Sequence, residues 1–113
     1  MTVLELAAAT GADIITKTAD TGKQVDKGYS CDLLSWVMAH GTAGMAWITV
    51  QTHMNVIAVA TLHDMACVLI PEGAAVAEDV LAKADEEGIA VLSSPRSAYE
   101  LCGLMYAAGL KGN

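Results

Sequence analysis

The hydrophobic and polar positions of residues 66–109 repeat one pattern twice: an apolar run, a sharp turn, and a segment with apolar residues three or four positions apart. The runs ACVLI and IAVLSS have the length and content of buried strands. The segments after the turns PEG and SSP have helical periodicity, and Gly88 is placed to end the first helix. Parallel strands joined by helices place these turns at one edge of a sheet, where ligands of open α/β sheets bind.

The remaining residues continue this alternation. Thr2 and Glu5 match a capping box for a first helix that Gly11 ends. The pattern then predicts a strand over 13–19, a short strand within 23–30, a helix capped by Asp32 and ending near Ala39, a strand over 46–51 and a helix over 54–63. The chain is therefore predicted to be α/β, a single small layered domain over 1–113 with a mostly parallel sheet of four or five strands flanked by helices.

The segment 54–62 has apolar residues on nearly every side of the predicted helix. Such a helix has to be buried all round, and a short chain has few elements to cover it. We therefore expect a homodimer in which this helix, including Ile57 and Val59, lies at the contact. The hydrophobic content of 54% also favours a self-association surface.

Charge and hydropathy exclude several partners. The net charge is −7, and only six Lys and Arg are scattered along 113 residues. Nucleic acids and anionic membranes select clustered basic residues, so we expect neither as a partner. No apolar run has the length of a membrane span, and no basic segment followed by an apolar core begins the chain. The sequence predicts a cytoplasmic protein.

The cysteines and histidines form no metal-binding motif. Cys31, Cys67 and Cys102 are odd in number and widely spaced, which fits neither a disulfide framework nor a CxxC site. His40, His53 and His63 are 13 and 10 residues apart, unlike compact metal sites. We expect no metal and no cofactor, with His40 and His63 stabilising the ends of their own helices. A redox or metal role for Cys31 or the histidines remains an alternative.

Three predicted loops would meet at the sheet edge and supply a candidate ligand site. An anion there would be held by helix N-termini and Arg96. In the alternative interpretation, Ser94 and Ser97 only cap the last helix, Ser97 with Glu100 as a capping box, and Glu72 opposes an anion. Both interpretations stay open. The candidate ligand-binding residues are Thr52, His53, Asn55, Glu72, Gly73, Ser93, Ser94 and Arg96.

Two stretches, AWITVQTHMNVIAVATLHDMACVLIPEG and ADEEGIAVLSSPRSAYELCGLM, resemble a DRTGG domain, and LELAAATGADIIT with GYSCDLLSWVM resembles its beginning. The name-giving residues differ. This chain has His53-Met54 in place of Asp-Arg, and Pro71-Glu72-Gly73 in place of Thr-Gly-Gly. The resemblance implies a fold similar to the N-terminal domain of bifunctional HPr kinase. It also implies a regulatory or dimerising module rather than a catalyst.

No catalytic motif opposes that implication. GxSxG is absent, and Thr21-Gly22-Lys23-Gln24 lacks the first glycine and the Ser or Thr of a P-loop. The sequence therefore predicts a non-enzymatic module that binds a small ligand, a protein partner, or both. The family's standalone members often lie beside iron-only hydrogenase genes, so the resemblance also implies an alternative as an accessory protein for a redox enzyme. Fused members accompany phosphotransacetylase and pyrophosphatase. A nucleotide or acyl-phosphate sensor, with its ligand at the edge formed by His53, Glu72 and Arg96, is a further alternative.

Overall fold

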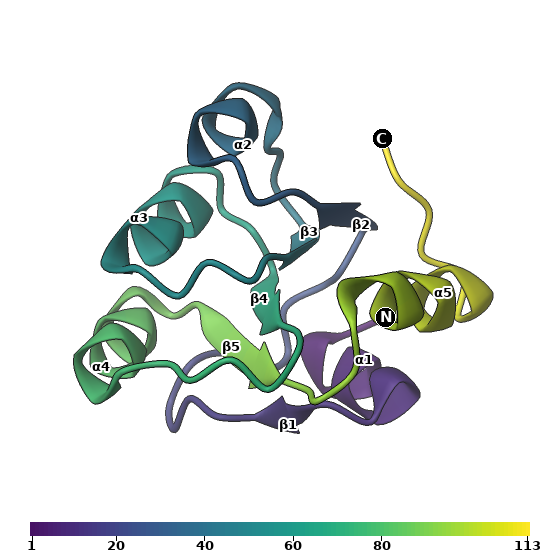
Figure 1. Ribbon diagram of the computed structural model, residues 1–113, viewed down its shortest axis with the longest axis horizontal. Coiled ribbons are helices and arrows are strands. Elements are labelled where there is room, and N and C mark those ends of the chain that lie inside the picture. The colour runs from purple at the N-terminus through teal and green to yellow at the C-terminus, as the bar shows by residue number, and fades with distance from the viewer.

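Five strands form one sheet in the computed structural model, which describes residues 1–113. The strand order is β1-β5-β4-β3-β2 (Figure 1). β1 is antiparallel to β5, and all other neighbours are parallel. The prediction of an α/β fold with a mostly parallel sheet is confirmed. The strands are β1 (Asp13–Ile14), β2 (Lys27–Ser30), β3 (Met45–Ile48), β4 (Cys67–Ile70) and β5 (Ala90–Ser93).

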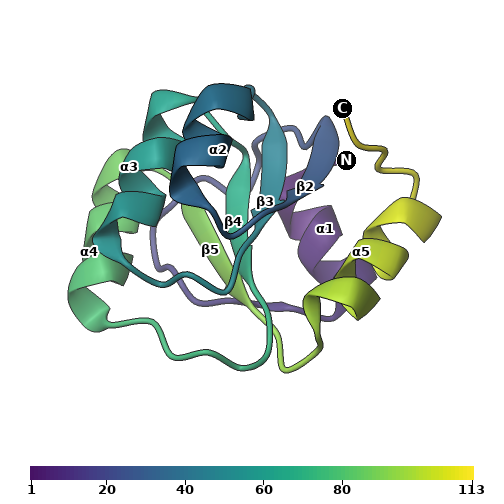
Figure 2. The same ribbon diagram turned by 45° about the horizontal axis from the view of Figure 1, so that its top comes forward.

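Helices cover both faces of the sheet (Figures 1 and 2). One face carries two helices and the other carries three. Because β3, β4 and β5 are buried on both sides, their alternate residues enter two separate cores. The helices of the first face are α1 (Val3–Thr10) and α5 (Ala98–Ala107), and those of the second are α2 (Leu34–His40), α3 (Met54–Leu62) and α4 (Glu78–Glu87).

Local capping explains where several helices begin and end. The Glu5 N–H donates to Thr2 Oγ1 at 3.2 Å and the Thr2 N–H donates to Glu5 Oε1 at 2.9 Å, which confirms the predicted capping box. α4 ends at Gly88, whose φ of 74° is a left-handed conformation that glycine adopts without strain. At α5, Ser97 Oγ accepts the Glu100 N–H at 3.2 Å.

The first strand is shorter than predicted. β1 covers Asp13–Ile14 rather than 13–19, because the chain then leaves the sheet for α4. The N–H groups of Lys17, Thr18 and Ala19 all donate to the Asp85 carboxylate, at 2.9, 2.7 and 2.9 Å. These bonds, the Thr18 one foremost, lower the Asp85 pKa. A single carboxylate on α4 thus replaces the ladder that a longer strand would have had.

Asp32 does not cap α2, contrary to the prediction. The capping position is Leu33, whose side chain makes no cap bond. Asp32 Oδ1 instead accepts the Thr49 hydroxyl at 2.8 Å and the Val50 N–H at 2.9 Å. The carboxylate thereby fixes the loop after β3, and β3 ends at Ile48 rather than at residue 51.

The inner side of α3 is buried within the chain. It lies between α2 and α4 (Figure 2). Ile57 and Val59 are only 2% and 4% exposed and belong to the core between these helices and the sheet. Their predicted place at a homodimer contact is therefore wrong. The outward side of α3 consists of other residues, chiefly Ala58 and Leu62.

The helices are short. α4 and α5 have ten residues each. No helix has the length and apolar character needed to cross a bilayer.

Candidate functional site

The carboxyl ends of β2, β3, β4 and β5 meet at one edge of the sheet. This edge is the lower one in Figure 2, where the loops to α4 and α5 run. All eight predicted ligand residues lie on loops or helix starts at this edge, or, for Ser93, at the end of β5. They fall into two groups.

The first group joins the turn after β4 to the turn after β5. The Glu72 N–H donates to the Arg96 carbonyl at 2.8 Å, and the Gly73 N–H donates to the Ser94 carbonyl at 2.9 Å. Ser94 is 1% exposed, and its Oγ accepts the Arg96 N–H at 3.1 Å. Ser93, the last residue of β5, adjoins them. The two turns are thus fastened by their own main-chain groups.

The second group lies at the start of α3. His53 is the N-cap residue, and its Nδ1 accepts the Asn55 N–H at 3.1 Å. Thr52 and His53 line a shallow hollow whose opposite wall is the first turn of α4, including Asp79. No residue of the first group lines this hollow, so the structure does not gather the eight residues into one pocket.

The turn after β4 has an unusual backbone. Glu72 and Gly73 are both left-handed, each with a φ of 63°. A residue with a Cβ pays roughly 1 kcal/mol for this conformation, and glycine does not. Glu72 stands where the resembled family has its first glycine. No side-chain contact offsets this strain, because the exposed Glu72 carboxylate makes no hydrogen bond or ion pair.

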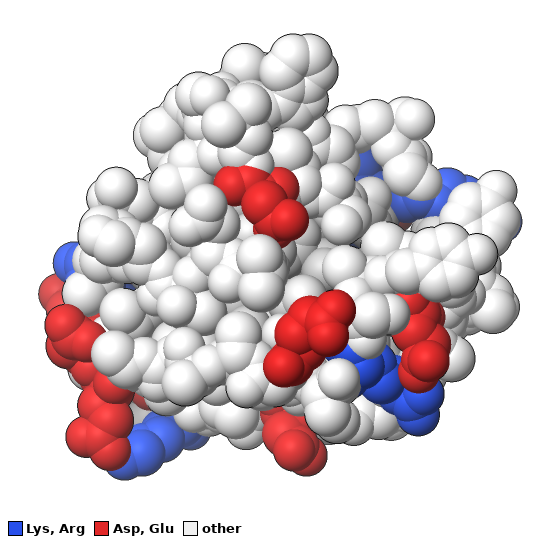
Figure 3. All heavy atoms as spheres, viewed as in Figure 1, with Lys and Arg blue, Asp and Glu red and all other residues white.

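Donors for an anion are scarce at this edge. His53 and Ser97 occupy amide groups at the starts of α3 and α5. The Arg96 guanidinium is ion-paired with Glu100. Acidic side chains, among them Asp32, Glu72 and Asp79, are exposed on the same edge, and Figure 3 shows acidic atoms spread over the visible face. The arrangement favours the interpretation in which these residues cap and fasten the loops.

The thiols and imidazoles also have structural surroundings. Burial raises the pKa of the Cys67 thiol to about 12, which keeps it protonated and inert. His40 lies in the last turn of α2, as predicted, with Nδ1 3.0 Å from the Trp36 carbonyl oxygen. His63 Nε2 contacts the Met38 carbonyl of α2 at 2.9 Å rather than the end of its own helix. No three potential ligand side chains lie close enough together to hold a metal ion.

A second surface was not predicted from the sequence. The outer sides of α2 and α3 expose Leu33, Trp36, Met38 and Leu62, at 62%, 53%, 45% and 67%. We call these four residues and Ala58 the α2–α3 face. In Figure 3 the surface over α2 carries no coloured atoms. One signal could have revealed it: residues 33–63 contain no Asp, Glu, Lys or Arg.

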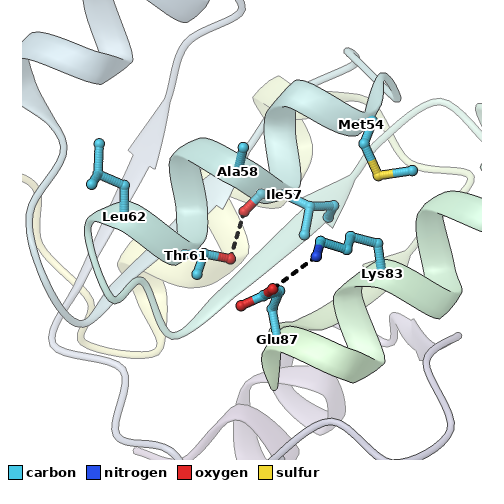
Figure 4. Close-up of a pocket in the computed structure, with 7 residues that line it drawn as sticks. All are labelled: Met54, Ile57, Ala58, Thr61, Leu62, Lys83 and Glu87. Carbon is cyan, nitrogen blue, oxygen red and sulfur yellow. Dashed lines mark hydrogen bonds and ion pairs between the residues drawn. The ribbon is translucent and has the colours of Figure 1, made fainter.

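A groove runs beside this face, between α3 and α4 (Figure 4). Its volume is about 290 Å³. Lys83 closes one side through an ion pair with Glu87, 2.9 Å from Nζ to Oε1. Thr61 donates its hydroxyl to the Ile57 carbonyl at 2.8 Å and offers little polarity to the groove. The lining residues are Met54, Ile57, Ala58, Thr61, Leu62, Lys83 and Glu87.

Comparison with solved structures finds a similar fold in the regulatory region of an enzyme. The similar structure is that of the CBS and DRTGG domains of the regulatory region of Clostridium perfringens pyrophosphatase, complexed with the activator diadenosine tetraphosphate. The TM-score is 0.69 at 10% identity, over 92% of this chain and 45% of that one. The fold is DRTGG-like. This chain spans less than half of that structure, and neither a family model nor a curated protein matches its sequence.

Proposed function

We propose that this chain is a non-catalytic regulatory module that works by binding a protein surface, its own copy included, and that takes a small ligand at the sheet edge. The observation that carries the proposal is the exposed, uncharged α2–α3 face. Large exposed apolar side chains on neighbouring helices are typical of interaction sites. Membership of the DRTGG family, as a relative of the HPr kinase N-terminal domain, is part of the proposal and is supported by the DRTGG-like fold.

The polar groups at the edge support a non-catalytic role. Nucleophilic catalysis needs an accessible nucleophile with a base within hydrogen-bond reach. The best pair is Thr49 with Asp32, 2.8 Å apart. Thr49 is only 1% exposed, and its hydroxyl also accepts the Gln51 N–H at 3.2 Å. The pair therefore braces the loop after β3 and leaves no hydroxyl for a substrate.

A small ligand is proposed at the sheet edge, first in the hollow lined by Thr52 and His53 and second at the joined turns that hold Glu72 and Ser94. The pyrophosphatase regulatory region binds a dinucleotide activator, which makes nucleotides the first compounds to test. The nucleotide or acyl-phosphate sensor has less support from the edge itself, because amide groups at the starts of α3 and α5 are occupied and Glu72 and Asp79 repel anions. A neutral ligand, or an anion accompanied by a divalent cation, suits this charge better.

Thermal unfolding with added compounds tests the ligand proposal. A ligand that binds only the folded chain raises the unfolding temperature with its concentration. Diadenosine tetraphosphate, ATP, adenosine and acetyl phosphate should be compared with and without Mg²⁺. We expect a shift that His53→Ala abolishes and that Tyr106→Ala, a substitution at the far end of α5, leaves intact. No shift with any compound would remove the ligand from the proposal and leave the protein-binding surface.

An accessory role at a redox enzyme is the second candidate, because Cys31 is partly exposed beside the α2–α3 face. It predicts that Cys31→Ser weakens capture of a metal- or thiol-bearing partner. Elemental analysis and thiol titration of the purified protein provide the check. A metal-free protein in which Cys31→Ser changes no binding would contradict this candidate.

A further inference from the structure

We infer that the α2–α3 face binds a second copy of this chain about a two-fold axis, so that α2 of one copy lies across α3 of the other. This rests on the self-association part of the proposed function and replaces Ile57 and Val59 as the contact residues. In a two-fold contact the same surface serves both copies. The surface therefore has to be compatible with itself in charge, shape and rigidity.

Charge selects a second copy as the occupant. All six basic and all thirteen acidic residues lie outside 33–63, so the outer sides of α2 and α3 carry no formal charge. The net charge of −7 makes contact between two copies through most other surfaces repulsive. The residues of the face itself bring no formal charge into such a contact, and the nearest charged side chains in the groove beside it, Lys83 and Glu87, are paired with each other. A strongly charged partner would gain nothing from this face and would be attracted elsewhere.

Contacts within the chain hold the face rigid. The Met38 carbonyl contacts His63 Nε2 at 2.9 Å, which ties α2 to the end of α3. Gly41 permits this approach, because a Cβ there would lie 2.7 Å from Met65 Cε and 2.8 Å from His63 Cδ2. The Trp36 ring stacks on His40 with centroids 4.1 Å apart. A preformed aromatic anchor loses little freedom on binding, as interface hot spots require.

A contact of the usual size has to extend over both helices. A stable dimer buries roughly 800 Å² per subunit, about a seventh of the 5520 Å² that this chain exposes. α2 has only seven residues, so the contact has to continue onto α3. Figures 1 and 2 show the two helices side by side. The small Ala58 lets a partner helix approach, and Leu62 provides the apolar contact.

Sedimentation velocity over a hundredfold range of protein concentration tests the inference. We expect the wild-type chain to be a dimer and Trp36→Asp to weaken dimerisation by at least about 30-fold, the loss typical of a hot spot. Leu62→Asp on α3 should act in the same direction. The matched control is Tyr99→Asp, an aromatic that is 91% exposed on the opposite face of the sheet, which should leave the dimer unchanged. Circular dichroism verifies that each variant is folded.

The outcomes separate the two proposals. A dimer that survives both Trp36→Asp and Leu62→Asp would overturn the inferred surface while self-association stood. A wild-type chain that stays monomeric throughout would overturn the inference, and the ligand titrations described above would then decide the proposed function on their own. A dimer lost in Tyr99→Asp but not in Trp36→Asp would place the contact on the face of α1 and α5.

Discussion

The sheet edge and the α2–α3 face differ in how their groups are already used. At the edge, hydroxyls, amides and carboxylates bond to one another, as Asp32 does with Thr49 and Val50. On the α2–α3 face, large apolar side chains contact solvent although the chain has two well-filled cores. A cluster of polar residues at a loop edge can therefore be structural, while exposed apolar residues on helices can be the surface that is free to bind.

The two tryptophans give the largest contrast between a buried and a free apolar residue. Trp47 is fully buried and donates its Nε1–H to the Cys31 carbonyl at 2.8 Å. Trp47→Ala should lower the free energy of unfolding by about 3–5 kcal/mol. Trp36→Ala should change it by less than about 0.5 kcal/mol in the monomer. Urea unfolding at low protein concentration measures both, and equal losses would contradict a free α2–α3 face.

Asp32 tests whether the edge is structural. Asp32→Ala removes the acceptor of two hydrogen bonds in the loop after β3, and we expect a loss of about 1–2 kcal/mol. Asp32→Asn, which retains one acceptor oxygen, should lose less. Chemical unfolding gives the values. If the alanine variant kept full stability and lost only ligand binding, the edge would be a site rather than a brace.

Glu72 tests the strained turn at the same edge. Glu72→Gly should raise the free energy of unfolding by about 1 kcal/mol, because glycine adopts a φ of 63° without strain. Glu72→Ala removes the carboxylate but keeps a Cβ, and so should gain little. The pair separates backbone strain from charge in urea unfolding. A gain in the alanine variant equal to that in the glycine variant would assign the effect to charge.

Salt concentration should have the smallest effect on the strength of the dimer. The sign of the effect depends on which of the two surfaces makes the contact. Raising NaCl from about 0.05 M to about 0.3 M screens the repulsion between acidic copies, so a dimer through the uncharged α2–α3 face should tighten by a few-fold at most. A contact made by ion pairs at the edge would weaken instead. Sedimentation equilibrium at the two concentrations decides between them.

Much of the fold follows from local patterns. The segment 66–109 has distinct strand and helix periods, and its elements were placed within a few residues. The predicted strand over 13–19 is too long, because the N–H groups of residues 17–19 bond to the Asp85 side chain instead of to a neighbouring strand. No local sequence pattern reveals a partner so far along the chain. The edge residues were located correctly along the chain, but their mutual hydrogen bonds could not be predicted. These bonds are what leave the edge with few free donors.

The α3 helix shows why the interface was misplaced. The apolar residues on nearly every side of this helix predict a subunit contact. In the structure α2, α4 and the sheet cover most of them within one chain. Periodicity gives the amount of apolar surface and not the identity of the covering element. Conversely, the large apolar residues Leu33 and Met38, at the start and near the end of α2, are both exposed. The absence of formal charge over 33–63 was the stronger signal.

Fluorine NMR of protein labelled with 5-fluorotryptophan reports on the α2–α3 face and the core separately, because the chain has only two tryptophans. One lies on the α2–α3 face and the other in the core. On dilution, the Trp36 resonance should shift as the dimer dissociates and the Trp47 resonance should stay constant. A Trp36 resonance unchanged across a dissociation that sedimentation detects would contradict the claim that the α2–α3 face binds a second copy.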